Sequence, residues 1–166
     1  KRMIWPFRRK SKKRMARIVI DEPITSSTRV SVIKALKQIE DREFPALILR
    51  IDSPGGTVGD SQEIYSAIKR LRDKGCKVVA SFGNISASGG VYIGVASDKI
   101  VANPGTITGS IGVIIRGNNL SELLNKIGIK FETVKSGIYK DILSPDKPLS
   151  DEGRELLQGL IDESYK

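Results

Sequence analysis

The sequence contains no histidine among its 166 residues. Serine and cysteine nucleophiles are commonly activated by an imidazole, so a Ser-His-Asp triad is excluded here. Any nucleophilic serine in this chain must rely on a lysine, aspartate or glutamate as its base.

Cysteine is nearly absent as well, because Cys76 is the only one. A single thiol allows no internal disulfide, which mildly favours a reducing compartment. We expect Cys76 to pack at the edge of a strand and to have no catalytic role, since no histidine is there to activate it. Long apolar runs are missing too: no stretch approaches the ~20 apolar residues of a membrane span or has the features of a signal-peptide core.

Positive charge is abundant but unevenly placed. The formal net charge is +9, yet residues 1–14 hold eight lysines and arginines and no acid, and the remainder is nearly neutral with 20 basic and 19 acidic side chains. We therefore expect residues 1–15 to be a basic, disordered tail. The alternative is that Met3-Ile4-Trp5-Pro6-Phe7 and the adjoining charges contact an anionic membrane surface. Nucleic-acid binding is not expected, because no basic face with interspersed aromatic residues recurs downstream.

Residues 16–166 alternate between strand and helix patterns, which predicts one α/β domain with a mostly parallel sheet and helices packed around it. A cap at Ser26 or Ser27 is expected for the first helix, and Asp60 and Glu63 have capping-box spacing for the second, which Gly75 closes. Gly109 to Ile115 forms a further apolar segment. The predicted strands are 16–20, 46–51, 77–82, 99–102 and 130–135, and the predicted helices are 27–40, about 60–74, a short one after Ser88, 119–126 and 150–165. The chain ends directly after the last helix without a breaker, which favours a piece of something longer.

The stretch Ile85-Ser86-Ala87-Ser88-Gly89-Gly90 follows an apolar strand and precedes an apolar helical stretch. A serine at such a strand-to-helix turn has its hydroxyl held clear of the backbone. The amides at the start of the following helix lack partners and suit a developing oxyanion. Ser88 is therefore the candidate nucleophile.

Three further polar stretches could serve this serine. Ser53-Pro54-Gly55-Gly56 follows a strand and could direct amides outward, although a plain tight turn is the commoner interpretation of this tetrapeptide. Thr106 to Ser110 is rich in hydroxyls, which in isolation more often satisfy a turn. Lys140 follows Lys135-Ser136-Gly137-Ile138-Tyr139, and a lone lysine is usually a solvated surface charge. The glycine turn lacks phosphate-binding spacings, and we expect neither cofactor nor metal.

Taken in order, Ser-Pro-Gly-Gly, Ser-Ala-Ser-Gly-Gly-Val-Tyr-Ile, Thr-Gly-Ser-Ile-Gly-Val and Lys-Ser-Gly-Ile-Tyr-Lys-Asp resemble the signal peptide peptidase A (protease IV) family. The resemblance runs from about Arg17 to the end of the chain. It implies a Clp-protease-like, crotonase-type α/β fold and a serine endopeptidase with a Ser/Lys dyad that cleaves peptides such as remnant signal peptides. The residues it implies are Ser88 as nucleophile, Lys140 as general base, Ser110 holding the lysine amine, and Gly89 with Gly55 and Gly56 as the oxyanion hole.

The implied chemistry sets physical conditions. A lysine accepts a proton only when neutral, and the ordinary pKa of its side chain is about 10.4. To act near neutral pH, this pKa has to fall by roughly three units, equivalent to ~4 kcal/mol, which burial beside apolar groups can supply. The resemblance also implies a ring-shaped homo-oligomer in which Lys140 reaches Ser88 of a neighbouring copy. We therefore predict that the two side chains are too far apart for a hydrogen bond within one chain.

Compartment and rival functions stay open at this point. We expect a membrane-associated protein of a bacterial-type cell, with either side of the membrane possible, because many members of the family have an upstream anchor that this sequence does not contain. One rival is a crotonase-like acyl-CoA enzyme, which needs no Ser-Lys pair. The other is a noncatalytic membrane-associated scaffold that uses the basic tail.

Overall fold

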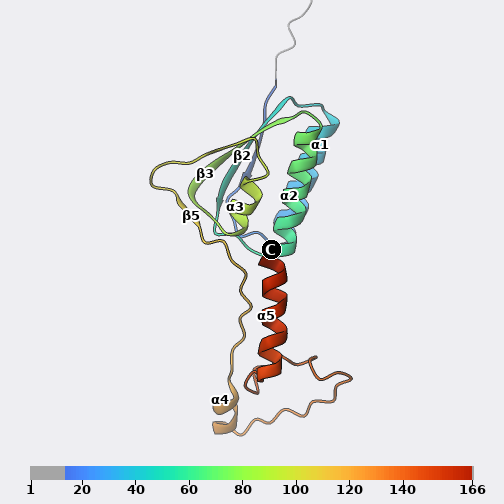
Figure 1. The fold of residues 1–166 in the computed structure, drawn as a ribbon, viewed down its shortest axis with the longest axis vertical. Helices are drawn as coiled ribbons and strands as arrows, with labels where there is room; N and C mark the ends of the chain where they lie inside the picture. The colour runs from blue at the N-terminus through green and yellow to red at the C-terminus, as the bar shows by residue number, and fades with distance from the viewer. Residues whose placement is uncertain (1–13, 166) are drawn as a thin grey trace, which may run out of the picture. The chain divides into compact units, whose positions relative to one another are not determined.

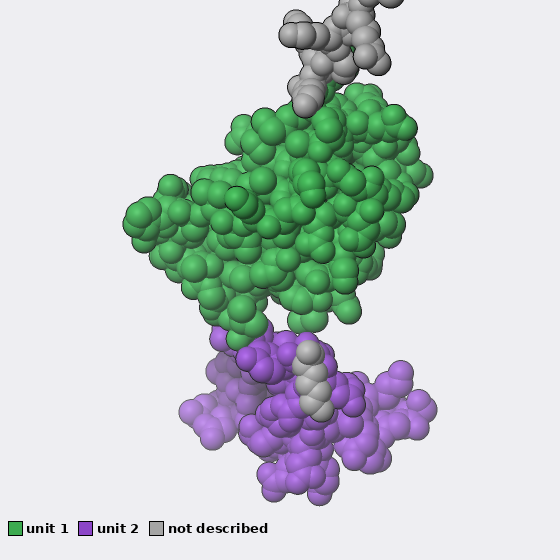
Figure 2. Space-filling model, turned by 45° about the horizontal axis from the view of Figure 1, so that its top comes forward, with its two compact units in different colours: residues 1–111 green, residues 112–166 purple. Residues whose placement is uncertain are grey.

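The computed structural model describes residues 14–165, and the chain divides into two compact units, residues 1–111 and 112–166 (Figure 1, Figure 2). Most of the basic tail, including Met3 to Phe7, lies outside the described residues. The expectation of one domain over residues 16–166 stays a prediction. Within residues 14–165, no helix combines the length and the apolar character that crossing a membrane requires.

The first unit is built on a parallel sheet. Strands β1 (Ala16–Ile20), β2 (Ala46–Ser53), β3 (Lys77–Ala87) and β4 (Lys99–Val101) lie side by side in that order, and β5 (Ile107–Gly109) also pairs with β3. The mostly parallel α/β sheet expected from the alternation of elements is confirmed. Parallel neighbours need crossover connections, which the helices supply.

Helices α1 (Ser26–Asp41) and α2 (Val58–Asp73) lie together on the same side of this sheet, and the short α3 (Gly89–Gly94) packs between α2 and strands β2 and β3 (Figure 1). Both predicted caps lie too far along the chain, by one or two residues for α1 and by three residues for α2. Thr25 caps α1 and donates its amide to Thr28 Oγ1 at 3.3 Å. Thr57 caps α2, and its hydroxyl bonds to Asp60, which lies inside the helix. Gly75 follows α2 in the left-handed conformation as predicted.

The core lies between the helices and one face of the sheet. Alternate residues of β2 are buried, as the two-residue period of a strand requires, and the same holds at the start of β3. Burial of each such aliphatic side chain is worth about 1.5–3 kcal/mol. The fully buried side chains include Ile20, Ile24, Leu47, Leu49, Ile51, Ile64, Ile68, Val78 and Ile93. Cys76 joins this core with 5% of its surface exposed, and burial raises the pKa of its thiol.

Strand β3 is longer than the sequence predicts. The Gly83-Asn84 pair was expected to end it, but the strand continues to Ala87. Its pairing with β2 shifts between Ile51↔Phe82 and Ser53↔Ser86, so β3 contains a bulge at this point. Glycine and asparagine therefore mark a bulge and not a strand end. β4 pairs with the first half of β3 and β5 pairs with the second half.

The second unit contains α4 (Ser121–Lys126) and α5 (Asp151–Tyr165), close to their predicted positions. The strand predicted at residues 130–135 is wrong, because these residues are exposed and outside any sheet. Of the predicted apolar segment from Gly109 to Ile115, only Gly109 belongs to a strand. On α5, Leu157 and Ile161 are half-buried and Leu160 is 50% exposed, so the apolar face of this helix is only partly covered.

Candidate active site

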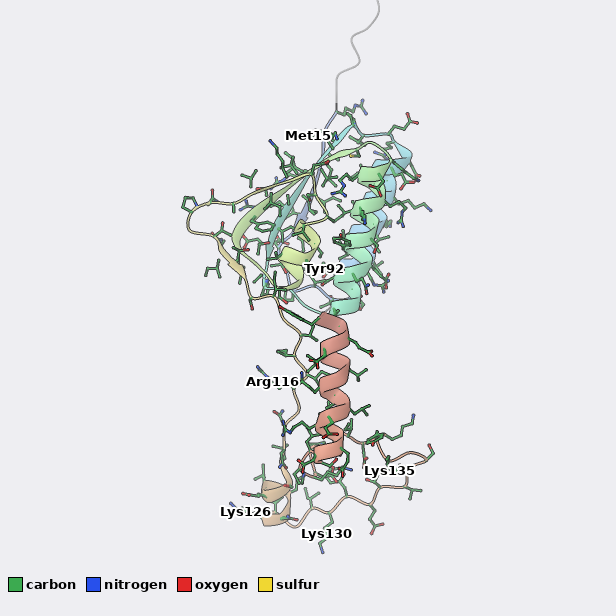
Figure 3. The ribbon with its side chains drawn as sticks, in the orientation of Figure 1. Met15, Tyr92, Arg116, Lys126, Lys130 and Lys135 are labelled. Carbon is green, nitrogen blue, oxygen red and sulfur yellow. The ribbon has the colours of Figure 1, made fainter. Side chains whose placement is uncertain are left out.

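Ser88 lies between the end of β3 and the start of α3, as its flanking sequence predicts. Its backbone has φ 49° and ψ −119°, a conformation that residues with a Cβ rarely adopt. Two hydrogen bonds hold it in place: its amide donates to the Gly109 carbonyl at 2.8 Å, and its carbonyl accepts from the Tyr92 amide at 3.0 Å. Tyr92, labelled in Figure 3, lies one turn further along α3. The half-buried Ser88 is thus held in a strained strand-to-helix turn.

The bulge in β3 directly precedes this turn and is bridged by Asp52. The Asp52 carboxylate accepts the Ile85 amide at 3.0 Å. It also lies against Gly83, where an added Cβ would come within 2.4 Å of the carboxylate carbon. Hydrogen bonds from the amides of Ile85 and Asn84 hold the pKa of Asp52 below its ordinary value. Asp52 therefore fixes the path by which β3 reaches Ser88.

The glycine turn after β2 lies against the serine. Gly55 has φ 97°, and a Cβ there would meet the Ser88 Cβ and the Gly89 nitrogen at 2.8 Å. At Gly89 a Cβ would lie 2.4 Å from Ser61 Oγ and 3.4 Å from the Gly56 nitrogen. Only glycine allows both close approaches. The sequence-predicted residues Gly55, Gly56 and Gly89 thus meet beside Ser88.

The amides of this cluster differ in what they bond. The Gly55 amide donates to Ser53 Oγ at 3.2 Å, and the Thr57 amide donates to the Ile24 carbonyl at 3.0 Å. Among the described residues, the amides of Gly56 and Gly89 have no hydrogen-bond acceptor. Two unpaired donors therefore lie close together next to a serine.

Ser110 follows β5 directly, with φ 50°. The parallel register pairs Ala87 with Gly109, and the Ser88 amide bonds to the Gly109 carbonyl. Both serines thus leave adjacent strands at the same end of the sheet. Thr108 donates its hydroxyl to the Ser86 carbonyl at 2.8 Å, which ties this end of β5 to β3.

Lys140 belongs to the second unit, in a loop held by ion pairs of its neighbours. Lys135, labelled in Figure 3, bonds to one oxygen of Asp141 at 2.6 Å and to the Ile138 carbonyl at 3.1 Å. Lys147 bonds to the other oxygen of Asp141 at 2.6 Å. These bonds, first that from Lys135, hold the pKa of Asp141 at about 2. Lys140 itself forms no ion pair among the described residues.

Ser88, Ser110, Gly55, Gly56 and Gly89 therefore all belong to the first unit, and Lys140 to the second. The sequence interpretation missed Asp52, which directly precedes the stretch from Ser53 to Gly56, and it missed the role of Ser53 within that stretch. Within residues 14–165, no group of three or more acidic or cysteine side chains lies close enough together to hold a metal ion. The roles of the site residues stay predictions.

Two family models match this chain. The model for peptidase family S49 matches residues 70–166, and the model for Clp protease matches residues 8–106. The first range includes Ser88, Ser110 and Lys140, and the second includes the glycine turn. The Clp protease match and the parallel sheet together show an α/β, Clp-protease-like fold.

Several curated proteins are similar over most of this chain. A Synechocystis protein named "Putative protease slr0021" is 61% identical over 98% of this chain and 58% of its own length. An Enterococcus faecium protein named "Putative signal peptide peptidase SppA" is 41% identical, over 78% of this chain and 38% of its length. Protease 4 of Salmonella typhi is 38% identical, over 76% of this chain and 20% of its own length. The chain therefore spans between a fifth and about three fifths of the length of these relatives.

Solved structures of one protease share the fold. A serine-to-alanine variant of the 1510-N membrane-bound stomatin-specific protease is 26% identical, covers 63% of this chain and 49% of that chain, and has a TM-score of 0.53. A lysine-to-alanine variant of the same protease, in complex with a substrate peptide, is 27% identical, covers 63% and 47%, and also has a TM-score of 0.53. With the family model matching more than half of its residues, the chain belongs to peptidase family S49.

Proposed function

We propose that this protein is a serine endopeptidase in which Ser88 is the nucleophile and Lys140 the general base. The observation that carries the proposal is the pair of unpaired amides, Gly56 and Gly89, beside a serine in a strained strand-to-helix turn. Backbone amides that are already in position can stabilise the negative charge of a tetrahedral intermediate without reorganising. The absence of histidine leaves lysine as the base that the family resemblance supplies.

The proposed reaction has two stages. The neutral Lys140 amine takes the proton of Ser88, whose oxygen attacks the peptide carbonyl, while the Gly56 and Gly89 amides donate to the resulting oxyanion. The protonated amine then gives its proton to the leaving amine, and an acyl-enzyme forms. Lys140 then deprotonates a water that attacks the ester, and it returns this proton to the Ser88 oxygen as the acid product leaves. Ser110 orients the lysine amine through a hydrogen bond that adds no charge.

We also propose that the site is shared between copies in a ring-shaped homo-oligomer, with Lys140 of one copy serving Ser88 of the next. The family resemblance implies this arrangement. It is also supported by Ile138 and Tyr139 beside Lys140, which are 71% and 44% exposed and suited to contact another protein surface.

Extended peptides are the proposed substrates, and remnants of signal peptides fit the name of the Enterococcus relative. The 1510-N protease with its substrate peptide supports the same class of ligand. Membrane association is proposed from that protease's description as membrane-bound, and from the basic and aromatic residues 1–14 of this chain.

Peptide hydrolysis and labelling by a serine-directed fluorophosphonate test the dyad directly. We expect Ser88→Ala and Lys140→Ala each to lower hydrolysis by about 10³-fold or more, and Ser88→Ala to abolish labelling. Lys130→Ala serves as the control and should retain activity, because Lys130 is an exposed lysine of the same unit as Lys140. Cleavage that persists in either dyad variant would remove that residue from the mechanism.

The same variants separate the rival functions. Hydrolysis of acyl-CoA thioesters that survives Ser88→Ala would favour a crotonase-like enzyme. Liposome binding by a protein that neither cleaves peptides nor takes the probe would favour a scaffold.

A further inference from the structure

We propose that Ser53 is a positioning residue of the oxyanion site. Its buried hydroxyl accepts a hydrogen bond from the Gly55 amide and thereby fixes the conformation of the glycine turn. In this conformation the Gly56 amide is free to donate to the oxyanion of the substrate. The inference rests on the proposed peptidase function and adds a residue to it. Ser53 touches no reacting atom, and it acts through the backbone of Gly55 and Gly56.

The Ser53 hydroxyl has two partners and a fixed orientation. Its side chain is fully buried, with 0% exposed surface. It donates to the Glu22 carbonyl at 2.7 Å and accepts from the Gly55 amide at 3.2 Å. A carbonyl can only accept, so the hydroxyl hydrogen points to Glu22 and a lone pair remains for Gly55. The hydroxyl therefore links the segment after β1 to the glycine turn.

The other side of the turn is held by Ile24. The Ile24 amide donates to the Gly55 carbonyl at 2.9 Å, and the Ile24 carbonyl accepts from the Thr57 amide at 3.0 Å. Ile24 also forms a parallel bridge with Gly56. The Gly55 carbonyl and the Gly56 N–H belong to one planar trans peptide unit and point in opposite directions. Because the carbonyl points to Ile24, the Gly56 N–H points away from it.

Within residues 54–57, these bonds leave one backbone amide without an acceptor. Pro54 has no N–H, the Gly55 amide bonds to Ser53, and the Thr57 amide bonds to Ile24. The Gly56 amide remains, close to Gly89. Without the Ser53 hydroxyl, the Gly55 amide would lose its acceptor, and the peptide unit between Pro54 and Gly55 would lose the hydrogen bond that fixes its orientation. The turn lies within van der Waals distance of Ser88, so a small rotation would displace the oxyanion donor.

Ser86 provides a matched control. It lies opposite Ser53 in the β2–β3 register and is also 0% exposed, but its hydroxyl has no hydrogen-bond partner among the described residues. Ser53→Ala and Ser86→Ala thus remove the same atom from neighbouring buried positions. Only the first removes a bond to the glycine turn.

The experiment compares kcat and KM for a peptide substrate with the inhibition constant of the corresponding peptide aldehyde, whose hemiacetal places an oxyanion in the site. We expect Ser53→Ala to lower kcat and weaken aldehyde inhibition by similar factors of about 10–100, with KM changed less than about threefold. Ser86→Ala should leave all three quantities within about threefold of wild type.

A second pair of variants tests the inference even if Ser53→Ala fails to fold. Ser53→Thr and Ser53→Val have the same shape and add the same bulk, but only threonine keeps the hydroxyl. We expect threonine to retain more than ten times the kcat of valine at equal thermal stability. Equal kcat and equal aldehyde inhibition in wild type and Ser53→Ala, or in the Thr and Val variants, would overturn the inference alone. A wild-type protein that neither cleaves peptide nor binds aldehyde would refute the proposed function and this inference with it.

Discussion

Ser88, the proposed nucleophile, has an unfavourable backbone conformation. Its φ is 49°, a value at which the Cβ of any residue other than glycine crowds the backbone. The hydrogen bonds to Gly109 and Tyr92 maintain this geometry. Such conformations cost about 1–3 kcal/mol and are retained where function requires them. The protein therefore gives up stability to expose one hydroxyl.

This strain predicts that Ser88→Gly is more stable than Ser88→Ala. Both variants lack the hydroxyl, but glycine adopts positive φ freely, and after its larger unfolded-state entropy is subtracted we expect a net gain of about 1 kcal/mol. Chemical denaturation of the two variants measures the difference in the free energy of unfolding. Equal midpoints and slopes would show that the strain is no larger than the entropy cost of glycine.

At this scale the sequence pattern placed Ser88 and the glycine turn after strands, because turn residues after a strand are visible in a sequence. The strand before Ser110 was not predicted, and Ser110 was singled out only by the family resemblance. Ser53 was seen only as part of a turn, because its partner Glu22 lies 31 positions away and that pairing depends on the tertiary fold. Local pattern does not encode such contacts.

Among the elements, β3 shows how a local signal was misinterpreted. Gly83 and Asn84 are typical of a strand end, but the Asp52 carboxylate bonds the freed amide of Ile85 and lets the strand continue. The alternating residues 130–135 show the opposite error, since a strand also needs a neighbour, and the described residues offer none there. Helices and buried strands were predicted well because their periodicity is internal to the element.

The loop of Lys140 is expected to loosen in acid. Lys135 and Lys147 hold the pKa of Asp141 at about 2, below its ordinary value of 3.8. A lowered folded-state pKa means that the ionised carboxylate stabilises the loop fully above about pH 4, and that this stabilisation is lost as the pH falls toward 2.

Hydrogen exchange of residues 135–147, expressed relative to the intrinsic rate at each pH, measures this effect. We expect protection to fall between about pH 4 and pH 2 in the wild type, and to be low at every pH in Asp141→Asn. Asp162→Asn is the control, because Asp162 bonds to the neutral Gln158 side chain. Unchanged protection in Asp141→Asn would show that the ion pairs do not order the loop.

For the molecule as a whole, the distribution of burial is uneven. The first unit has a continuous apolar core, whereas in the second unit Gly153 is the one buried residue within 112–165. Ile114, Phe131, Val134 and Ile138 are among its exposed apolar side chains. A unit with so little core is suited to gain apolar contacts by association.

A shared site predicts that two inactive variants complement each other. Ser88→Ala supplies Lys140 and Lys140→Ala supplies Ser88, so mixed rings should regain roughly a quarter of wild-type peptide hydrolysis at equal proportions. The variants are dissociated together, reassembled and assayed, and each variant treated alone is the control. A mixture as inactive as its components would place both residues of each site in one copy.

The burial of Cys76 has a practical consequence for work on this protein. Its thiol is enclosed by the core and its pKa is raised, so little of the reactive thiolate is present at neutral pH. Maleimide reagents will therefore react slowly with Cys76 and quickly with a cysteine introduced at the surface. Fluorophores or spin labels can then be attached to an introduced surface cysteine without first replacing Cys76.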